Sequence, residues 1–356
     1  MRCTLVGLGT QPTPFDEMIL SCTFVRNSIG CWSKTFCLIR KKFHKGKAWG
    51  KLKPEDREQV KAGLLQAITN EPEVSVRSAI IQLIGSIARH ELGAGGAGWL
   101  QLMQLIQQKV VSGEGEDRVQ GVTLISALAE VAGEQVKVNL KDFLGLFRKT
   151  LQDTELEVCF HTIVALTYFV CQTSSDEVGL FQQLIPAVLV KIEQIAAVNQ
   201  EKAVVAIDIF DELIESEVAI VVPHIKPMVE LCLRLAQDKE GKVEDSLKIK
   251  AVTFLGRLTR LKKKTIVKHK LYIPMIQVIF EVMAAQEVDE DDPEEEDEDE
   301  DSPGLAASQS LDVLALNLPP EKYITALLSQ VCCTLRITNY NSTLKSCPGA
   351  TGSGES

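Results

Sequence analysis

The sequence has few aromatic residues: Phe, Trp and Tyr together make up 5% of its 356 residues. Strands of sandwiches and barrels are rich in aromatic and β-branched residues that alternate with polar ones, and the chain has no convincing alternation of this kind. Leu, Ile, Val and Ala dominate the 45% of residues that are hydrophobic. The composition therefore favours packed helices and disfavours an all-β fold.

Patterns typical of metal sites are also missing. The ten cysteines form no CxxC pair, and the five histidines are scattered, so the sequence predicts neither a zinc site nor any other metal site. Cys159, Cys171 and Cys232 lie in apolar helical patterns, which indicates free thiols in the core of a protein from a reducing compartment.

Catalytic arrangements are equally sparse. Cys159 and His161 lie two positions apart on one predicted helix, where side chains do not face each other. Glycines 93, 95 and 98 match a dinucleotide-binding pattern, but a helix is predicted before them, whereas that pattern needs a strand. We therefore expect neither an enzyme nor a cofactor.

Long apolar runs are absent as well. The longest uncharged stretch, residues 158–175, includes His161 and several Thr and Gln residues, so it favours a buried helix over a membrane span. Pro12, Pro14, Asp16 and Glu17 interrupt any apolar segment near the N-terminus, which argues against a signal peptide. We expect a soluble intracellular protein.

The net charge of −10 comes from one place. Residues 287–301 hold 13 acidic residues and no Lys or Arg, whereas residues 1–53 hold ten basic and two acidic residues. The acidic total argues against a nucleic-acid binder. The acidic run should be solvated and without fixed structure, because its charges repel one another.

Helical periodicity of apolar residues extends over most of the chain. Glu71-Pro72 breaks the pattern, and Ser75 is expected to cap the helix that follows. Helices are expected at 54–70, 76–91, 99–111, 117–132, 140–152, 155–172, 177–197, 200–216, 222–237, 244–261, 270–285 and 307–316, with a further helix from residue 321. Their pairing repeats about every 37 to 48 residues, which is close to the period of HEAT repeats. The sequence thus predicts an all-α, right-handed α-solenoid of about six to seven HEAT helix pairs.

Charge clusters are the candidate binding sites. The acidic run offers a contact for a basic partner or is a solubilising insert between two helices of one repeat. Its candidate residues are Asp289, Glu290, Asp291, Asp292, Glu294, Glu295, Glu296, Asp297, Glu298, Asp299, Glu300 and Asp301. Two basic clusters are docking patches for an acidic partner or solvated helix ends. They are Arg40, Lys41 and Lys42, with Lys45 and Lys47 close by, and Lys262, Lys263 and Lys264, with Lys268 and Lys270 close by.

Three stretches resemble the importin-β-type karyopherin family. They are residues 38–42 with the helix from Pro54, residues 211–218 continuing to 228–232, and the acidic run followed by residues 314–322. The resemblance covers about residues 36–330 and excludes both ends, so we interpret the chain as a truncated or alternative form of the N-terminal part of such a receptor.

The resemblance implies a nuclear import receptor found in cytoplasm and nucleus. Such receptors bind Ran–GTP, nucleoporins and basic cargo such as histones or ribosomal proteins, and need no cofactor. Ran would contact the second helices of the first repeats, here 76–91, 117–132 and 155–172, together with residues 36–45. The candidate basic residues for that contact are Arg40, Lys41, Lys42, Lys262, Lys263 and Lys264. The alternative is a HEAT-repeat scaffold or adaptor without a transport role.

The expected organisation has five parts. An atypical N-terminal segment (1–35) precedes the HEAT solenoid (36–286), the acidic loop (287–304), further HEAT helices (305–337) and a disordered tail (338–356).

Overall fold

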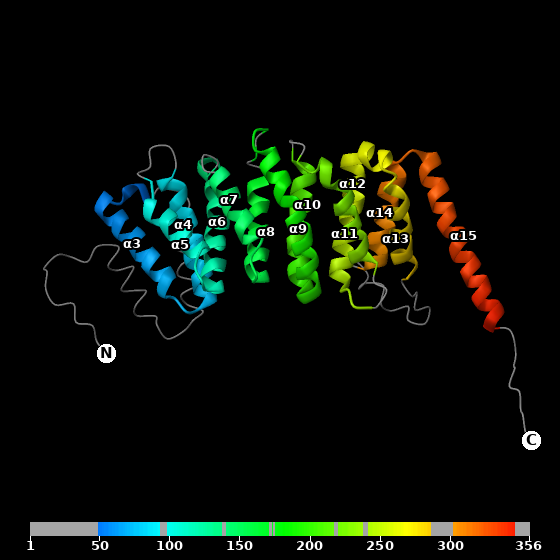
Figure 1. The fold of residues 1–356 in the computed structure, drawn as a ribbon, viewed down its shortest axis with the longest axis horizontal. Coiled ribbons are helices and arrows are strands. Elements are labelled where there is room, and N and C mark those ends of the chain that lie inside the picture. Colours follow the sequence, from blue (N-terminus) through cyan, green and yellow to red (C-terminus); the bar gives the residue numbers. More distant parts are fainter. Residues whose placement is uncertain are drawn as a thin grey trace, which may run out of the picture. The chain divides into compact units, whose positions relative to one another are not determined.

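The structure, a computed structural model, describes residues 49–92, 98–136, 140–170, 173, 175–216, 220–237, 241–285 and 302–345, with the backbone alone for 131–136 and 333–345. These residues form thirteen α-helices and no β-strand (Figure 1). The helices are α3 (Pro54–Asn70), α4 (Val74–Glu91), α5 (Leu100–Val110), α6 (Gly115–Val136), α7 (Leu140–Thr150), α8 (Leu156–Val170), α9 (Val178–Val198), α10 (Gln200–Glu215), α11 (Ile225–Ala236), α12 (Asp245–Lys268), α13 (Tyr272–Ala284), α14 (Pro303–Asn317) and α15 (Pro320–Lys345). The all-α prediction is confirmed.

The helices form pairs with the predicted period. The first helices of the pairs (α3, α5, α7, α9, α11 and α13) begin at residues 54, 100, 140, 178, 225 and 272. The steps between them range from 38 to 47 residues, as expected for HEAT units. Helices α3, α9 and α10 match the predicted ranges 54–70, 177–197 and 200–216 to within one residue at either end.

The chain divides into two compact units, one up to Leu140 and one from Lys141. In the first unit, α4 packs on α6, while α3 packs on α4 and α5 on α6. In the second unit, the second helices of the pairs stack in the order α8, α10, α12, α14, and the first helices stack in the order α9, α11, α13, α15. Neighbouring pairs thus bury the apolar faces that one pair alone would expose, which is the principle of a solenoid.

Helix α4 shows how the apolar pattern determines burial. Val76, Ile80, Ile84 and Ile87, which the sequence places on one face, are all at most 4% exposed. The predicted cap at Ser75 is wrong, because α4 begins at Val74 with Glu73 in the N-cap position. The carboxylate of Glu71 instead accepts a hydrogen bond from the backbone N–H of Glu73, which fixes the turn before the helix.

Two glycines allow second helices to pack closely. A Cβ atom on Gly85 of α4 would lie 2.8 Å from the backbone oxygen of Ala127 in α6. A Cβ on Gly256 of α12 would lie 3.2 Å from Oγ of Ser310 in α14. Buried aromatic rings fill other contacts between second helices, as in Phe210 and Phe254, whose ring centroids are 5.3 Å apart. Each such ring contributes to stability, because replacing a core Phe by Ala costs roughly 3–5 kcal/mol.

The helices after the acidic run extend beyond their predicted bounds. Helix α14 begins at Pro303, because Oγ of Ser302 accepts a hydrogen bond from the N–H of Leu305 and proline suits the first helical position. The predicted acidic loop therefore ends two residues too late. Helix α15 continues to Lys345, beyond the expected start of the tail at residue 338, since extending a helix costs less than starting one. Because α14 packs on both α13 and α12, the acidic run lies between the two helices of one repeat, as predicted.

Two apolar helices lie within the second unit. In α8, which covers most of the uncharged stretch, Val158, Ile163 and Phe169 are at most 1% exposed, so the buried-helix interpretation is confirmed. Helix α9 is long and apolar enough to cross a membrane by length and composition, and 44% of its apolar window is buried. It packs against α8, α10 and α11, as a core helix of a solenoid does.

Candidate partner-binding surfaces

The structure describes only some of the predicted binding residues. The acidic residues 289–301, Arg40, Lys41 and Lys42, and the segment 36–45 lie outside the described residues, so these sites stay predictions. The second helices expected to contact Ran correspond to α4, α6 and α8. Lys262, Lys263 and Lys264 lie on α12 of the second unit.

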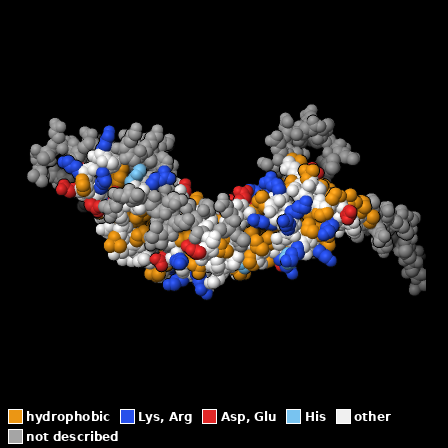
Figure 2. Space-filling model, turned by 90° about the horizontal axis from the view of Figure 1, so that it is seen from above, with side chains coloured by type: hydrophobic (Ala, Val, Ile, Leu, Met, Phe, Trp, Pro, Cys, Tyr) orange, Lys and Arg blue, Asp and Glu red, His pale blue; other side chains and the backbone are white. Residues whose placement is uncertain are grey.

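The second basic cluster lies at a bend in α12. The sequence predicts a helix that ends at residue 261, but α12 continues to Lys268, and Lys262 interrupts it with non-helical backbone angles (φ −123°, ψ 31°). Lys263 and Lys264 are exposed, and Lys262 is half-buried. Figure 2 shows Lys and Arg side chains gathered over the later helices of the second unit. The cluster is therefore accessible to a partner.

Ion pairs connect α12 with the preceding second helix, α10. Nζ of Lys250 lies 2.5 Å from Asp208 and 3.1 Å from Asp211, and Arg257 is 2.9 Å from Asp211 and also pairs with Glu215. Burial alone would lower the pKa of Lys250, but its hydrogen bonds to the two aspartates outweigh this and raise the pKa. These five charged residues on α10 and α12 thus serve packing between repeats.

A second set of charges connects α8 with α10. Nζ of Lys202 lies 2.5 Å from Glu157, which also pairs with Nε2 of His161 at 3.3 Å. Burial would raise the pKa of Glu157, but the hydrogen bond from Lys202 lowers it overall. Burial lowers the pKa of His161 despite the nearby carboxylate, so the imidazole is neutral at pH 7.

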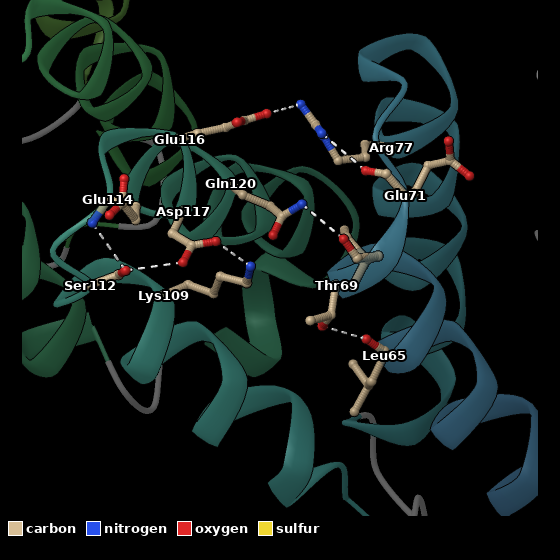
Figure 3. A network of polar contacts seen from close by, with 11 residues as sticks. Leu65, Thr69, Glu71, Arg77, Lys109, Ser112, Glu114, Glu116, Asp117 and Gln120 are labelled. Atoms are coloured by element: carbon tan, nitrogen blue, oxygen red, sulfur yellow. Dashed lines mark hydrogen bonds and ion pairs between the residues drawn. The ribbon is translucent and has the colours of Figure 1, made fainter.

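The first unit holds a comparable network (Figure 3). Arg77 of α4 pairs with Glu116 of α6, and Nε2 of Gln120 donates to the backbone oxygen of Ile68 at 3.0 Å. Asp117 accepts hydrogen bonds from Lys109 and from Ser112. The hydrogen bond from Lys109 is the main reason that the pKa of Asp117 is lowered. These contacts hold α3, α4, α5 and α6 together.

A buried charge cluster lies at the start of the first unit. The Glu91 carboxylate accepts hydrogen bonds from Nε1 of Trp49 at 2.8 Å and from Nζ of Lys61 at 2.9 Å. Lys61 and Glu91 are 3% and 4% exposed, and Nζ of Lys61 also lies 6.0 Å from the ring centroid of Trp99. Burial would lower the pKa of Lys61, but hydrogen bonds to Glu58 and Glu91 raise it.

A groove lies between two first helices, α9 and α11. It has a volume of about 240 Å³. Its apolar lining comes from Pro186, Leu189, Val190, Pro227 and Leu231, and its polar lining from Glu193, His224, Glu230 and Arg234. Nε of Arg234 donates to Glu193 at 2.9 Å across the groove. The groove can hold one or two apolar side chains of a partner.

Sequence reasoning missed these contacts, although a signal for them exists. Several polar partners are separated by 39 to 45 positions, which is one repeat. They are Arg77–Glu116, Glu157–Lys202, Glu193–Arg234, Asp211–Lys250, Glu215–Arg257 and Gln237–Glu281. A search for complementary residues one repeat apart would have found them.

The described residues offer little for catalysis. They contain no group of His, Cys, Asp and Glu that could hold a metal ion. Burial raises the pKa of the Cys159 and Cys232 thiols, so both stay protonated at neutral pH. The charged and grooved surfaces suit recognition of a macromolecule better than chemistry.

Comparisons with known proteins connect this helical array with nuclear transport receptors. The family described as "IPO5-like, TPR repeats" matches residues 72–231. Importin-4 of Mus musculus is 30% identical over 285 residues, and importin-4 of Homo sapiens is 27% identical over 291 residues. The chain is similar to importin-4. The resemblance seen in the sequence is thereby confirmed.

The similarity to importin-4 covers most of the chain but a minor part of the relatives. It includes 77% and 79% of the chain for the mouse and human proteins, and 26% of each of those proteins. The chain thus spans about a quarter of the length of the curated relatives it matches.

Solved structures agree with the fold expected of an importin-4 homologue. Kap121p bound to RanGTP aligns with a TM-score of 0.69 at 18% identity, covering 83% of this chain and 28% of that one. Kap121p bound to Nup53p aligns with a TM-score of 0.71 at 17% identity, covering 85% and 29%. The likeness shows that the chain has an α-solenoid fold. Although the family name refers to TPR units of about 34 residues, the spacing of 38 to 47 residues is that of HEAT units.

Proposed function

We propose that the chain is a nuclear transport receptor of the karyopherin type that binds Ran–GTP and basic cargo such as histones or ribosomal proteins. The observation that carries the proposal is the similarity to importin-4 over 285 residues, which is 77% of the chain. Because solved karyopherins of the same fold include one bound to RanGTP, Ran is the first partner to test. Shuttling between cytoplasm and nucleus would follow from this activity.

The test for Ran is a binding assay with the full chain immobilised and purified Ran in solution, loaded with GTP or GDP. The proposal expects binding of the GTP form and much weaker binding of the GDP form. The proposed contacts are on α4, α6 and α8 and at Arg40, Lys41 and Lys42. Equal binding of the two forms, or none of either at low salt, would contradict a receptor of this type.

For basic cargo, we propose the acidic run at residues 287–301 as the contact. Exposed charges are screened over about 8–10 Å at physiological salt, so affinity should fall steeply as salt rises. The test titrates a histone H3 tail peptide into the full chain and into a variant in which Gln and Asn replace the run's 13 Glu and Asp residues. The neutral variant should lose most of the binding.

A shuffled acidic run is the matched control. It keeps length, composition and charge, so a contact that works by charge retains its affinity. If the neutral variant binds the basic peptide as well as the natural chain does, the run is a solubilising insert. A HEAT-repeat scaffold without a transport role would then be the better interpretation.

For nucleoporins, we propose the groove between α9 and α11. The support is its apolar lining and the existence of a karyopherin structure with Nup53p bound. Val190 lines the groove and is 52% exposed, so Val190→Asp should fold normally and weaken binding of a nucleoporin fragment. Val198→Asp, at the end of α9 and 75% exposed, is the control. Equal effects of the two substitutions would refute the assignment.

A further inference from the structure

The segment between Asp245 and Glu281 has an extreme charge composition. It contains nine Lys and Arg residues and no Asp or Glu. Three of the nine are engaged in packing or local pairs: Lys248 with Asp245, and Lys250 and Arg257 with the acidic residues of α10.

The other six form what we name the α12 basic patch: Arg260, Lys262, Lys263, Lys264, Lys268 and Lys270. All but the half-buried Lys262 are exposed. Within the described part of the chain, none of these six side chains forms an ion pair or a hydrogen bond. Among the residues that the structure describes, no acidic side chain neutralises this concentration of positive charge.

The helix dipole explains only part of this charge. Cations stabilise a helix C-terminus through its last turn, and the effect falls off beyond that turn. Lys268 is in the last turn of α12, but Arg260, Lys263 and Lys264 come before it. Gathering four to six like charges costs repulsion that an anionic partner would remove.

The backbone at Lys270 gives a second, independent observation. Helix α12 ends in a Schellman motif, in which the N–H of Leu271 donates to Ile266 O at 3.0 Å and the N–H of Lys270 to Val267 O at 3.2 Å. This motif places Lys270 in the left-handed region (φ +55°), where glycine is strongly favoured. The chain thus has a lysine at a position where a glycine would make the protein more stable. Strained backbone positions of this kind cluster at functional sites.

The chemistry of the patch selects a class of partner. Five of the six residues are lysines, which act as flexible point charges and do not grip a phosphate bidentately. The patch also surrounds a helix C-terminus, whose carbonyl groups repel a compact anion. Tyr272 is only 9% exposed, and the exposed His269 is a single small ring, whereas proteins that bind single strands stack successive bases on several aromatic rings. Leu261 and Ile273, 40% and 42% exposed, add limited apolar surface, enough for side chains of a peptide.

We propose that the α12 basic patch is a docking surface for an acidic polypeptide segment of a partner protein. This interaction goes beyond the proposed transport function, because it recognises acidic rather than basic protein and uses other residues than the acidic run.

The test measures fluorescence anisotropy of a labelled peptide made of Glu blocks with interspersed Leu, with the full chain as titrant. The variant combines Arg260→Gln, Lys263→Gln, Lys264→Gln and Lys268→Gln. Because each exposed charge pair contributes little to affinity, the loss of four pairs together should weaken binding by about tenfold. A version with arginine at the three lysine positions should keep the affinity, because the charge is retained.

The matched control removes one Arg and three Lys charges at other positions of the second unit. It combines Arg148→Gln, Lys141→Gln, Lys149→Gln and Lys226→Gln. These four residues are exposed, so their replacement should change the affinity less than twofold. If both variants weaken peptide binding equally, the peptide responds only to the overall charge of the protein, and the proposal is overturned. A single-stranded oligonucleotide with the same charge as the peptide is tested alongside it. If it binds more tightly than the peptide and its binding depends on the same four residues, the proposal is also overturned.

Lys270→Gly separates stability from binding. Glycine relieves the left-handed strain and should raise the thermal midpoint by about 1–3 °C, while removing one charge from the patch. The proposal expects a more stable protein with weaker peptide binding. A more stable variant with unchanged peptide affinity, together with an unaffected quadruple variant, would refute the docking surface.

Discussion

Breaking the buried pair of Lys61 and Glu91 should strongly destabilise the first unit. Glu91→Gln removes the carboxylate that faces the Lys61 ammonium at 2.9 Å and leaves a cation that is 3% exposed. Removing one partner of a buried ion pair costs about 3–5 kcal/mol. Glu58 remains 2.5 Å from Nζ of Lys61, and its side chain is 58% exposed, so it compensates only in part. The expected loss in the free energy of unfolding is about 3 kcal/mol.

Replacing both partners should recover much of this loss. In Lys61→Met with Glu91→Leu, no buried unpaired charge remains, because Glu58 is exposed to solvent, and apolar replacements of similar volume are often neutral for stability. The indole N–H of Trp49 loses its acceptor, which leaves a residual cost of about 1–3 kcal/mol. The double variant should therefore be more stable than Glu91→Gln alone.

Tryptophan fluorescence during urea unfolding provides the assay. Trp49 and Trp99 are both 2% exposed and belong to the cluster, so their emission reports on the first unit. Trp32, which lies outside the described residues, is replaced by Phe in every variant so that it adds no signal. A loss below about 1 kcal/mol in Glu91→Gln, or a double variant less stable than the single one, would refute the idea of a tightly coupled buried pair.

Three further predictions concern packing and pH. Gly85→Ala should lower the free energy of unfolding, measured in urea, by about 1–3 kcal/mol, because its Cβ would lie 2.8 Å from Ala127 O. Gly63→Ala, which has open space around it, should be neutral or stabilising. Equal effects of the two substitutions would contradict the packing of α4 on α6. Phe254→Ala should cost about 3–5 kcal/mol in the second unit, and a loss below about 1 kcal/mol would exclude a core role for this ring. Burial lowers the pKa of both His161 and His224, so the unfolded state binds these protons at higher pH than the folded state, and stability should fall as the pH drops below about 6.5. His161→Gln should show a smaller fall, because the contribution of His161 is gone and that of His224 remains. An NMR titration that gives His161 a pKa above about 6.5 would contradict this prediction.

Local pattern was sufficient to predict most of the fold. Apolar periodicity and helix breakers placed α3, α9 and α10 to within a residue, because each of these helices buries one regular face between clear boundaries. It failed at α12, where the apolar pattern ends before the helix does. The residues from Lys262 to Lys268 form a short second segment that a bend joins to the first.

The candidate sites were harder to predict because they depend on contacts between repeats. The sequence singled out Lys262, Lys263 and Lys264, with Lys268 and Lys270, by their density of charge, but not Arg260, which α12 brings into the same patch. The pairing of Lys250 with α10 depends on which helices stack, and the groove depends on the packing of α9 against α11. Composition and periodicity do not reveal either arrangement.

The most direct test of the proposed transport role is competition between Ran and cargo on the full chain. A labelled histone H3 tail peptide is bound first, and GTP-loaded Ran is then titrated, with GDP-loaded Ran as the control. Binding linkage requires that each ligand weakens the other by the same factor. The account predicts that Ran–GTP releases the peptide and Ran–GDP does not; peptide binding that neither form of Ran alters would contradict it.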